Sequence, residues 1–269
     1  MRIITLTVFT SFLIFFSCSL ADTKTKKDSD DKSIRIVREY SSSSNLKAEI
    51  SVKGKVRHGI TKNYNKHGIL LSKVNYVDGK KEGKTINYYT TGKVHSTIMY
   101  KNNRKNGYAV WYYENGKPYS INPFVNNKLN GIKKKYHENG KLFAEIPYKD
   151  EYPGIGLKEY TAEGKLITDY PKIIVEEINQ IKFNNKYILK IYLSNRSRSA
   201  KFYIDDLYDG KYLRNYVYEI PAQQGVATRI YEAPPGYVKF EKINIIAKVN
   251  TRLGNPYITQ RTYNLAIKH

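Results

Sequence analysis

The sequence predicts an all-β protein, in which an elongated antiparallel β-hairpin repeat array is followed by a β-sandwich. Glycines and tyrosines recur every 24 residues through the middle of the chain. Apolar and polar residues alternate after each glycine, as in half-buried strands. The final part holds short β-prone runs separated by turn residues. We expect a signal peptide at residues 1–18, a flexible tether at 19–33, hairpin repeats at 34–172 and a sandwich domain at 173–269.

The N-terminus predicts export. Residues 3–16 form an apolar run of 14 residues, whereas crossing a bilayer takes roughly 20, so the run has the length of a signal-peptide core. Two cleavage sites are open. Ser17-Cys18 could end a lipobox, making Cys18 the lipidated first residue of a bacterial envelope lipoprotein, and the lone cysteine favours this. Cutting after Ser19-Leu20-Ala21 would instead give a periplasmic or secreted protein.

A flexible tether is predicted next. Residues 22–33 are polar and nearly neutral. Such a segment has no apolar surface to bury, so it does not form a packed structure.

The repeat is defined by three series of residues spaced 24 apart. A first glycine series is interrupted only in the fifth unit, where an isoleucine lies between two glycines: Gly59, Gly83, Gly107, Gly131 and Ile155. A second series has no exception: Gly68, Gly92, Gly116, Gly140 and Gly164. The tyrosine series begins one unit earlier: Tyr40, Tyr64, Tyr88, Tyr112, Tyr136 and Tyr160.

Each unit is predicted to be a strand, a tight turn, a second strand and a polar turn. Residues 113–117 and 137–141 are hairpin turns in which glycine supplies a positive φ. The following strand places apolar, small, apolar and aromatic residues on one face, as at Leu142, Ala144, Ile146 and Tyr148. A single hairpin is only marginally stable in water, so each unit depends on its neighbours.

Two places depart from the pattern. Pro118 removes a ladder donor, so the third hairpin is expected to be weakened or bulged. Near Tyr40, four serines (41–44) replace the glycine turn, which predicts a half-formed cap at the N-terminal end of the array.

Residues 107–117 (Gly-Tyr-Ala-Val-Trp-Tyr-Tyr-Glu-Asn-Gly-Lys) and 131–141 (Gly-Ile-Lys-Lys-Lys-Tyr-His-Glu-Asn-Gly-Lys) resemble the bacterial variant of the MORN repeat. The resemblance covers about residues 35–172. Units one and five depart from the motif, with Ile69 in place of lysine and Ile155 in place of glycine. The resemblance implies an elongated hairpin array and no catalytic residues. Bacterial proteins with this repeat are often labelled antitoxins of the YwqK type.

The C-terminal part predicts an immunoglobulin-like sandwich, since it holds six or seven short strands in a short length of chain. Turn-forming residues separate the runs, as at Asp209-Gly210 and 234–236. The expected strands lie at 187–193, 200–204, 212–220, 226–231, 237–249 and 257–267.

Candidate catalytic chemistry is sparse. The single cysteine excludes an intramolecular disulfide and a cysteine zinc site, and the five histidines are scattered. The acidic pairs Glu176-Glu177 and Asp205-Asp206 have no partner motif, so they are interpreted as solvated surface rather than as acids for hydrolysis or calcium ligands. We predict that the chain is not an enzyme and uses no metal or cofactor.

The composition predicts an anionic partner. The formal charge is +22, and residues 34–172 carry 26 basic against 12 acidic residues, or +14, which attracts anionic molecules. Trp111, with Tyr113 and Tyr119 nearby, is a candidate aromatic patch for a sugar or a protein, against plain packing. Lys133 and Lys135, in the run Lys133-Lys134-Lys135 before Tyr136, form a candidate basic site, against a solvated strand, which is favoured because successive lysines of a strand point to opposite faces.

Two functions are therefore considered. The first is a non-catalytic exported binding or scaffold protein that engages a protein or an anionic polysaccharide, touching the membrane only through a lipid at Cys18. The alternative is an antitoxin or immunity-type protein that neutralises a toxin by direct binding. Nucleic acid is an unlikely partner.

Overall fold

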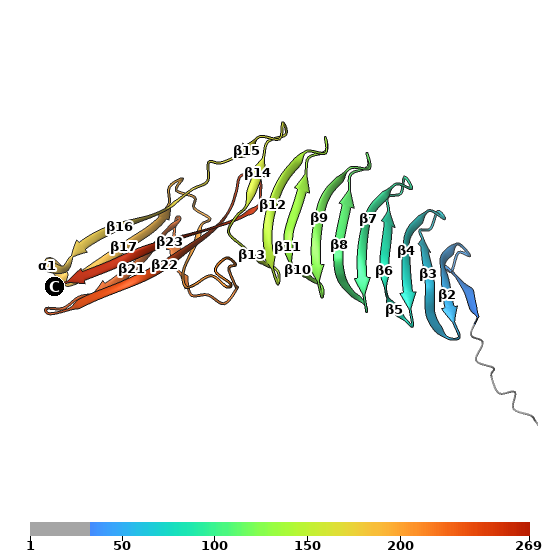
Figure 1. Cartoon of the computed structure of the whole chain (residues 1–269), viewed down its shortest axis with the longest axis horizontal. Helices are drawn as coiled ribbons and strands as arrows, with labels where there is room; N and C mark the ends of the chain where they lie inside the picture. Colours follow the sequence, from blue (N-terminus) through green and yellow to red (C-terminus); the bar gives the residue numbers. More distant parts are fainter. Residues whose placement is uncertain (1–32) are drawn as a thin grey trace, which may run out of the picture.

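The computed structural model of the chain describes residues 33–269, and the predicted signal peptide, Cys18 and all but the last residue of the tether lie outside the described residues. The molecule is elongated, with a row of strands leading to a sandwich at one end (Figure 1). The one helix in the described part is α1 (Ile181–Asn184). The all-β prediction and the hairpin array are confirmed.

The array is one antiparallel sheet in which strands adjacent in sequence are adjacent in space. Three two-residue strands extend the turns: β5 (Lys80–Lys81), β10 (Lys128–Leu129) and β13 (Tyr152–Pro153). The main strands follow in sheet order: β1 (Ile34–Tyr40), β2 (Leu46–Lys53), β3 (Val56–Tyr64), β4 (Leu70–Val77), β6 (Gly83–Tyr88), β7 (Val94–Lys101), β8 (Arg104–Tyr112), β9 (Pro118–Val125), β11 (Gly131–Tyr136), β12 (Leu142–Lys149), β14 (Lys158–Tyr160) and β15 (Leu166–Ile167).

Two turn types alternate along the array. At the glycine turns, the Gly68 amide donates to the Asn65 carbonyl at 3.0 Å, and the Asn65 amide to the Ile69 carbonyl at 2.9 Å. At the polar turns, both central residues have positive φ, as at Asn102 (49°) and Asn103 (67°). That is the conformation of type I′ turns, which match the twist of the flanking strands.

In the first glycine series, Gly59, Gly107 and Gly131 are required by both conformation and space. Gly131 has a φ of +120°, and a β-carbon there would lie 3.1 Å from Pro123 Cγ. In the fifth unit, where Ile155 interrupts the series, Gly156 has a φ of +105° and lies against Pro147. The glycine role has therefore moved one residue along the chain.

The two departures predicted above have different outcomes. A register shift does occur beside Pro118, between Trp111 and Tyr112, but other hairpins have the same shift. The serine turn is complete rather than half-formed: Ser44 takes the glycine position with a φ of 60°, and its amide donates to the Ser41 carbonyl at 2.9 Å.

One face of the array, which we call the inner face, carries Thr61, Ala109 and Ile146, and all three are buried. Over most of its length the sheet is a single layer (Figure 1). Small residues are covered by larger neighbours across the strands, as where Ala109 pairs with Ile98 and Asn122. Cross-strand packing of this kind is the unit of sheet stabilisation.

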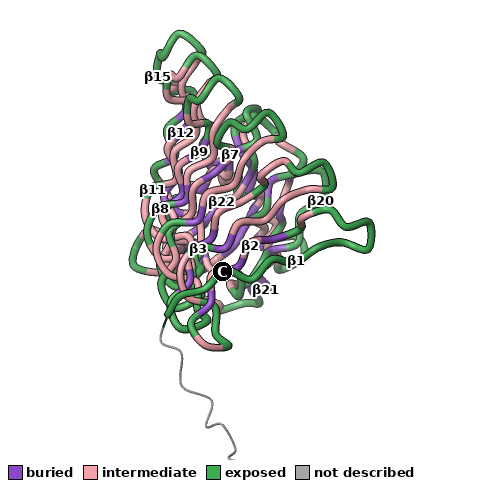
Figure 2. Tube along the Cα trace, turned by 90° about the vertical axis from the view of Figure 1, so that its right-hand side faces the viewer, coloured by how far each residue is buried: buried purple, intermediate pink, exposed green. Residues whose placement is uncertain are grey.

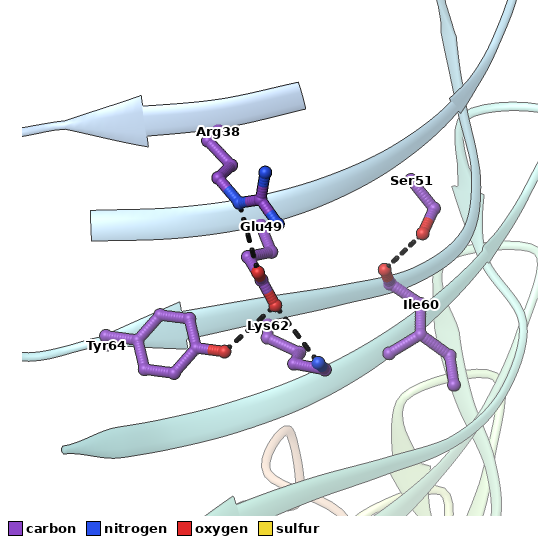
Figure 3. A network of polar contacts seen from close by, with 6 residues as sticks. All are labelled: Arg38, Glu49, Ser51, Ile60, Lys62 and Tyr64. Carbon is purple, nitrogen blue, oxygen red and sulfur yellow. Dashed lines mark hydrogen bonds and ion pairs between the residues drawn. The ribbon is translucent and has the colours of Figure 1, made fainter. Parts of the chain in front are cut away.

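The opposite, outer face carries an ionic network at the N-terminal end (Figure 3). Glu49 accepts hydrogen bonds from Lys62 at 3.0 Å, Tyr64 at 3.1 Å and Arg38 at 3.3 Å. The same arrangement recurs four repeats later, where Glu145 lies 3.5 Å from Lys134 and accepts from Tyr160 at 3.3 Å.

The network predicts acid sensitivity of the first hairpin. Hydrogen bonds from Lys62 and Tyr64 lower the pKa of Glu49. A carboxyl whose pKa is lower in the folded state stabilises the fold above its unfolded pKa, and this contribution is lost as pH falls through the folded value. When the pH is lowered below about 4.5, we expect the amide protection factors of β1 to decrease. Glu49→Gln should lack this dependence, and equal pH profiles would contradict the prediction.

The C-terminal part is a sandwich of two four-stranded sheets. Its strand order matches the ABED and C′CFG sheets of immunoglobulin-like folds. Buried residues of both sheets form one core, as Leu189, Ile191, Phe202, Ile245 and Leu265 do. The first sheet contains β16 (Ile173–Gln180), β17 (Lys186–Leu193), β21 (Val226–Glu232) and β20 (Ala222–Gln223), and the second β19 (Glu219–Ile220), β18 (Lys201–Ile204), β22 (Val238–Asn250) and β23 (Pro256–Lys268).

The structure corrects two sequence-based strand assignments. The strand expected at 212–220 is wrong except for β19, because Leu213 belongs to a loop that packs with Leu207 on Ile246 and Ile258. Strand β16 was missed, since Glu176 and Glu177 interrupt its apolar pattern. The buried segments run along the strands and the exposed ones gather at the turns (Figure 2).

Candidate functional site

The array and the sandwich meet at a polar joint. The tip of the β22–β23 hairpin, residues 251–255, lies against the inner face of the last repeats. Glu159 is 2% exposed, and its Oε1 accepts hydrogen bonds from Asn255 Nδ2 and Thr251 Oγ1, both at 2.6 Å. Lys135 Nζ donates to Asn255 Oδ1 at 2.9 Å. One oxygen of a buried carboxylate is thus held by two groups from the sandwich.

Aromatic stacking and a backbone hydrogen bond between the sandwich and the array reinforce the joint. Tyr170 and Tyr257 stack with their ring centroids 4.9 Å apart. Burial and the nearby Glu159 raise the pKa of Tyr170 to about 12. On the other side, the Leu213 amide donates to the Pro153 carbonyl at 3.0 Å. These contacts fix the sandwich on the array.

A cleft of about 510 Å³ lies beside the joint. Its walls include Asp169 and Tyr170 from the end of the array, and Asn195, Arg252 and Tyr257 from the sandwich. The mixed polar and aromatic lining suits a small polar group. Its signs of charge are mixed, so it does not select anions.

Trp111, Lys133 and Lys135 share the inner face. Trp111 and Lys135 both pair with Ser120, from opposite sides. Lys133 pairs with Ile146, two residues along the same strand from Lys135. The structure therefore brings the predicted tryptophan and lysines together, although no direct contact joins Trp111 to either lysine.

The two lysines differ in their contacts. Burial lowers the pKa of Lys135, while Glu159 opposes that shift; its Nζ also lies 4.9 Å from the centre of the Phe143 ring. Burial and the charge of Lys135 lower the pKa of Lys133. Within residues 33–269 Lys133 has no hydrogen bond or ion pair. Lys135 is therefore part of the joint, and Lys133 is not.

Tyr113 and Tyr119 form a pair at the glycine-turn end of their strands. Their ring centroids are 5.5 Å apart, and the Tyr113 hydroxyl donates to the Tyr136 carbonyl of the next repeat at 2.8 Å. Tyr119 is 38% exposed. The equivalent pairs in the flanking repeats are Tyr89–His95 and His137–Phe143. Tyr113 therefore links repeats, and Tyr119 is the accessible member.

A row of cations, each near an aromatic ring, follows the polar-turn end of the inner face. We call this row the cation–aromatic ladder. In each of three repeats a cation lies near an aromatic ring. The distances to the ring centroids are 5.4 Å for Arg57 over Tyr76, 5.3 Å for Lys81 over Tyr100 and 5.0 Å for Lys105 over Phe124. Successive pairs are two strands apart, or roughly 9.5 Å.

The ladder and the joint were not found from the sequence. A sequence pattern could have revealed the ladder, because its cations are spaced 24 residues apart, as are its aromatic residues. A weaker pattern marks Glu159, since it occupies the inward position that Trp111 and Lys135 hold in earlier repeats. No sequence pattern marks its partners Thr251 and Asn255.

The four residues of the acidic pairs are exposed, as predicted for surface residues, and Glu177 and Asp206 accept hydrogen bonds from side chains of other strands. Glu177 accepts hydrogen bonds from the hydroxyls of Tyr187 and Tyr263, which lower its pKa. Asp206 accepts from Asn244 Nδ2 at 2.7 Å. Among the described residues no group of three His, Cys, Asp or Glu side chains is placed to hold a metal. In residues 33–269 no helix has the length and apolarity needed to span a membrane.

Comparison with known proteins agrees with this geometry. The family model described as MORN repeat variant matches residues 57–78, 81–102, 105–126 and 129–150. No curated protein matches the chain. Repeats of this family are non-enzymatic binding modules for proteins or membranes. Residues 57–150 of this chain are therefore four tandem repeats of the MORN repeat variant family.

Proposed function

We propose that this chain is a non-catalytic binding protein of the bacterial envelope, whose repeat array engages an acidic polysaccharide along the cation–aromatic ladder. The ladder is the observation that supports the proposal. It presents one cation per repeat, at a constant spacing, each held near an aromatic ring.

The chemistry of the ladder fits a polyanion. A cation held over a ring stays positioned with part of its hydration removed. Regularly spaced cations can contact successive charges of one polymer, so weak contacts add within a single complex. The +14 charge of residues 34–172 attracts such a polymer over a longer range. Lys133 extends the same basic face toward the joint.

Neutralising the ladder is expected to weaken binding to polygalacturonate at least tenfold. The variant is Arg57→Gln, Lys81→Gln and Lys105→Gln in one chain. The matched control, Lys47→Gln, Lys66→Gln and Lys165→Gln, removes the same charge from exposed positions near the serine turn and two of the glycine turns. Affinity is measured by calorimetry at low and high salt, with dextran as the neutral polymer. An equal loss of affinity in both variants would mean that binding depends on the net charge of the array and not on the ladder.

The alternative partner is an acidic protein, such as a toxin, and the same experiment can distinguish it. Polyglutamate presents carboxylates without sugar rings. Binding to polyglutamate with no binding to polygalacturonate would overturn the polysaccharide proposal and favour a protein partner.

The lipid anchor is a separate part of the proposal, supported by the apolar run that ends at Cys18. When the full chain is expressed in a bacterium, we expect it in the membrane fraction. Cys18→Ser should move it to the soluble fraction. Recovery of the unchanged chain in the soluble fraction would favour cleavage before Asp22.

A further inference from the structure

The two ends of the array sheet are protected differently. At the C-terminal end, β15 has only two residues, and its Ile167 lines the cleft against the sandwich. At the N-terminal end, β1 has seven residues, all of them exposed, and pairs only with β2 among the described strands. Figure 1 shows β1 as the outermost strand, remote from the sandwich.

Strand β1 lacks several of the usual protections of a sheet edge. It contains neither proline nor lysine, and Ile34, Ile36 and Val37 are 59%, 57% and 41% exposed. The Arg38 side chain lies across β2 toward Glu49 (Figure 3), so its charge is directed inward rather than along the edge. A seven-residue edge strand with exposed apolar side chains is a template for pairing with another strand.

The sequence of β1 is complementary to itself in one register. Arg35 and Glu39 are equally distant from Val37, and all three lie on the inner face, where they pair with Val52, Ala48 and Ile50. Antiparallel pairing of two copies about Val37 would place Arg35 of each copy opposite Glu39 of the other. Glu39 has no partner within the described residues, so this ion pair would not replace one within the chain.

We propose that β1 pairs antiparallel with β1 of a second copy of this chain, about a two-fold axis at Val37. The two sheets then become one continuous sheet, with the sandwiches at its outer ends. An isologous contact of this kind closes at a dimer. The proposal is independent of the ligand, because the ladder residues are not in β1.

A charge-swap series tests the register. Glu39→Arg and Arg35→Glu each place like charges opposite one another, and each should raise the dimer dissociation constant about tenfold. The double variant Arg35→Glu/Glu39→Arg restores both pairs and should return to near the wild-type value. The measurement is sedimentation velocity over a concentration series of the full chain.

A cross-link tests the symmetry axis. Directly opposed residues of antiparallel strands have Cα atoms about 4.5–5.5 Å apart, within disulfide range. In a Cys18→Ser background, Val37→Cys should form a covalent dimer under mild oxidation, whereas the equally exposed Val77→Cys (40%) should not. A chain that stays monomeric at every concentration, or a dimer that none of these changes affects, would overturn the proposal.

Discussion

Replacing Glu159 by alanine is expected to lower the free energy of unfolding of the array by about 3 kcal/mol. The change removes the acceptor for the Thr251 hydroxyl and the Asn255 amide. Asn255 is 1% exposed, so its side-chain amide cannot replace the lost hydrogen bond with one to water. Leaving a buried donor unsatisfied costs more than the net gain from forming the bond.

The single tryptophan makes this measurement direct. Trp111 lies in the array, so urea denaturation followed by its fluorescence reports on the repeats. Glu159→Gln is the matched control, because its amide oxygen can still accept from Asn255; we expect it to lose about 1 kcal/mol. Small-angle scattering should show a more variable angle between array and sandwich in Glu159→Ala alone. An unchanged unfolding midpoint for Glu159→Ala would refute the role of the joint.

Replacing Gly131 by alanine is expected to destabilise the array by about 2–3 kcal/mol. Two costs combine at this position. A φ of +120° is strained for an L-residue, and the new methyl group would lie 3.1 Å from the Pro123 ring, which proline cannot rotate away.

Gly68→Ala separates the two costs. Gly68 has a φ of +77° and nothing within 4 Å of the added methyl group, so only the conformational cost of about 1 kcal/mol applies. Both variants are compared by urea denaturation at Trp111. Equal losses would mean that the contact with Pro123 contributes nothing.

The joint and the glycine series have different consequences for function. The glycines of both series take positive φ values, and the ladder recurs with the same 24-residue spacing. The joint holds the Lys135 ammonium group on Asn255 of the sandwich. In the proposed binding mode, a polymer that follows the ladder would therefore meet Lys133, not Lys135, near the sandwich.

The repeat sequence by itself determined the array. Its contacts join residues one repeat apart, as where the Tyr113 hydroxyl meets the Tyr136 carbonyl, and such contacts appear in the sequence as a period. Turn chemistry fixed both strand ends, because glycine and asparagine take the positive φ values that the turns require. The shift from Ile155 to Gly156 was not visible, since either neighbouring glycine could serve.

Only the tertiary structure decided the joint and the position of the candidate site. Glu159 and Asn255 are 96 residues apart, and Asn255 lies outside the repeat, so no period connects them. Lys133 and Lys135 look alike in sequence, and only the docked hairpin tip distinguishes the free lysine from the engaged one. Burial by a distant segment depends on how two domains pack, which local propensity does not encode.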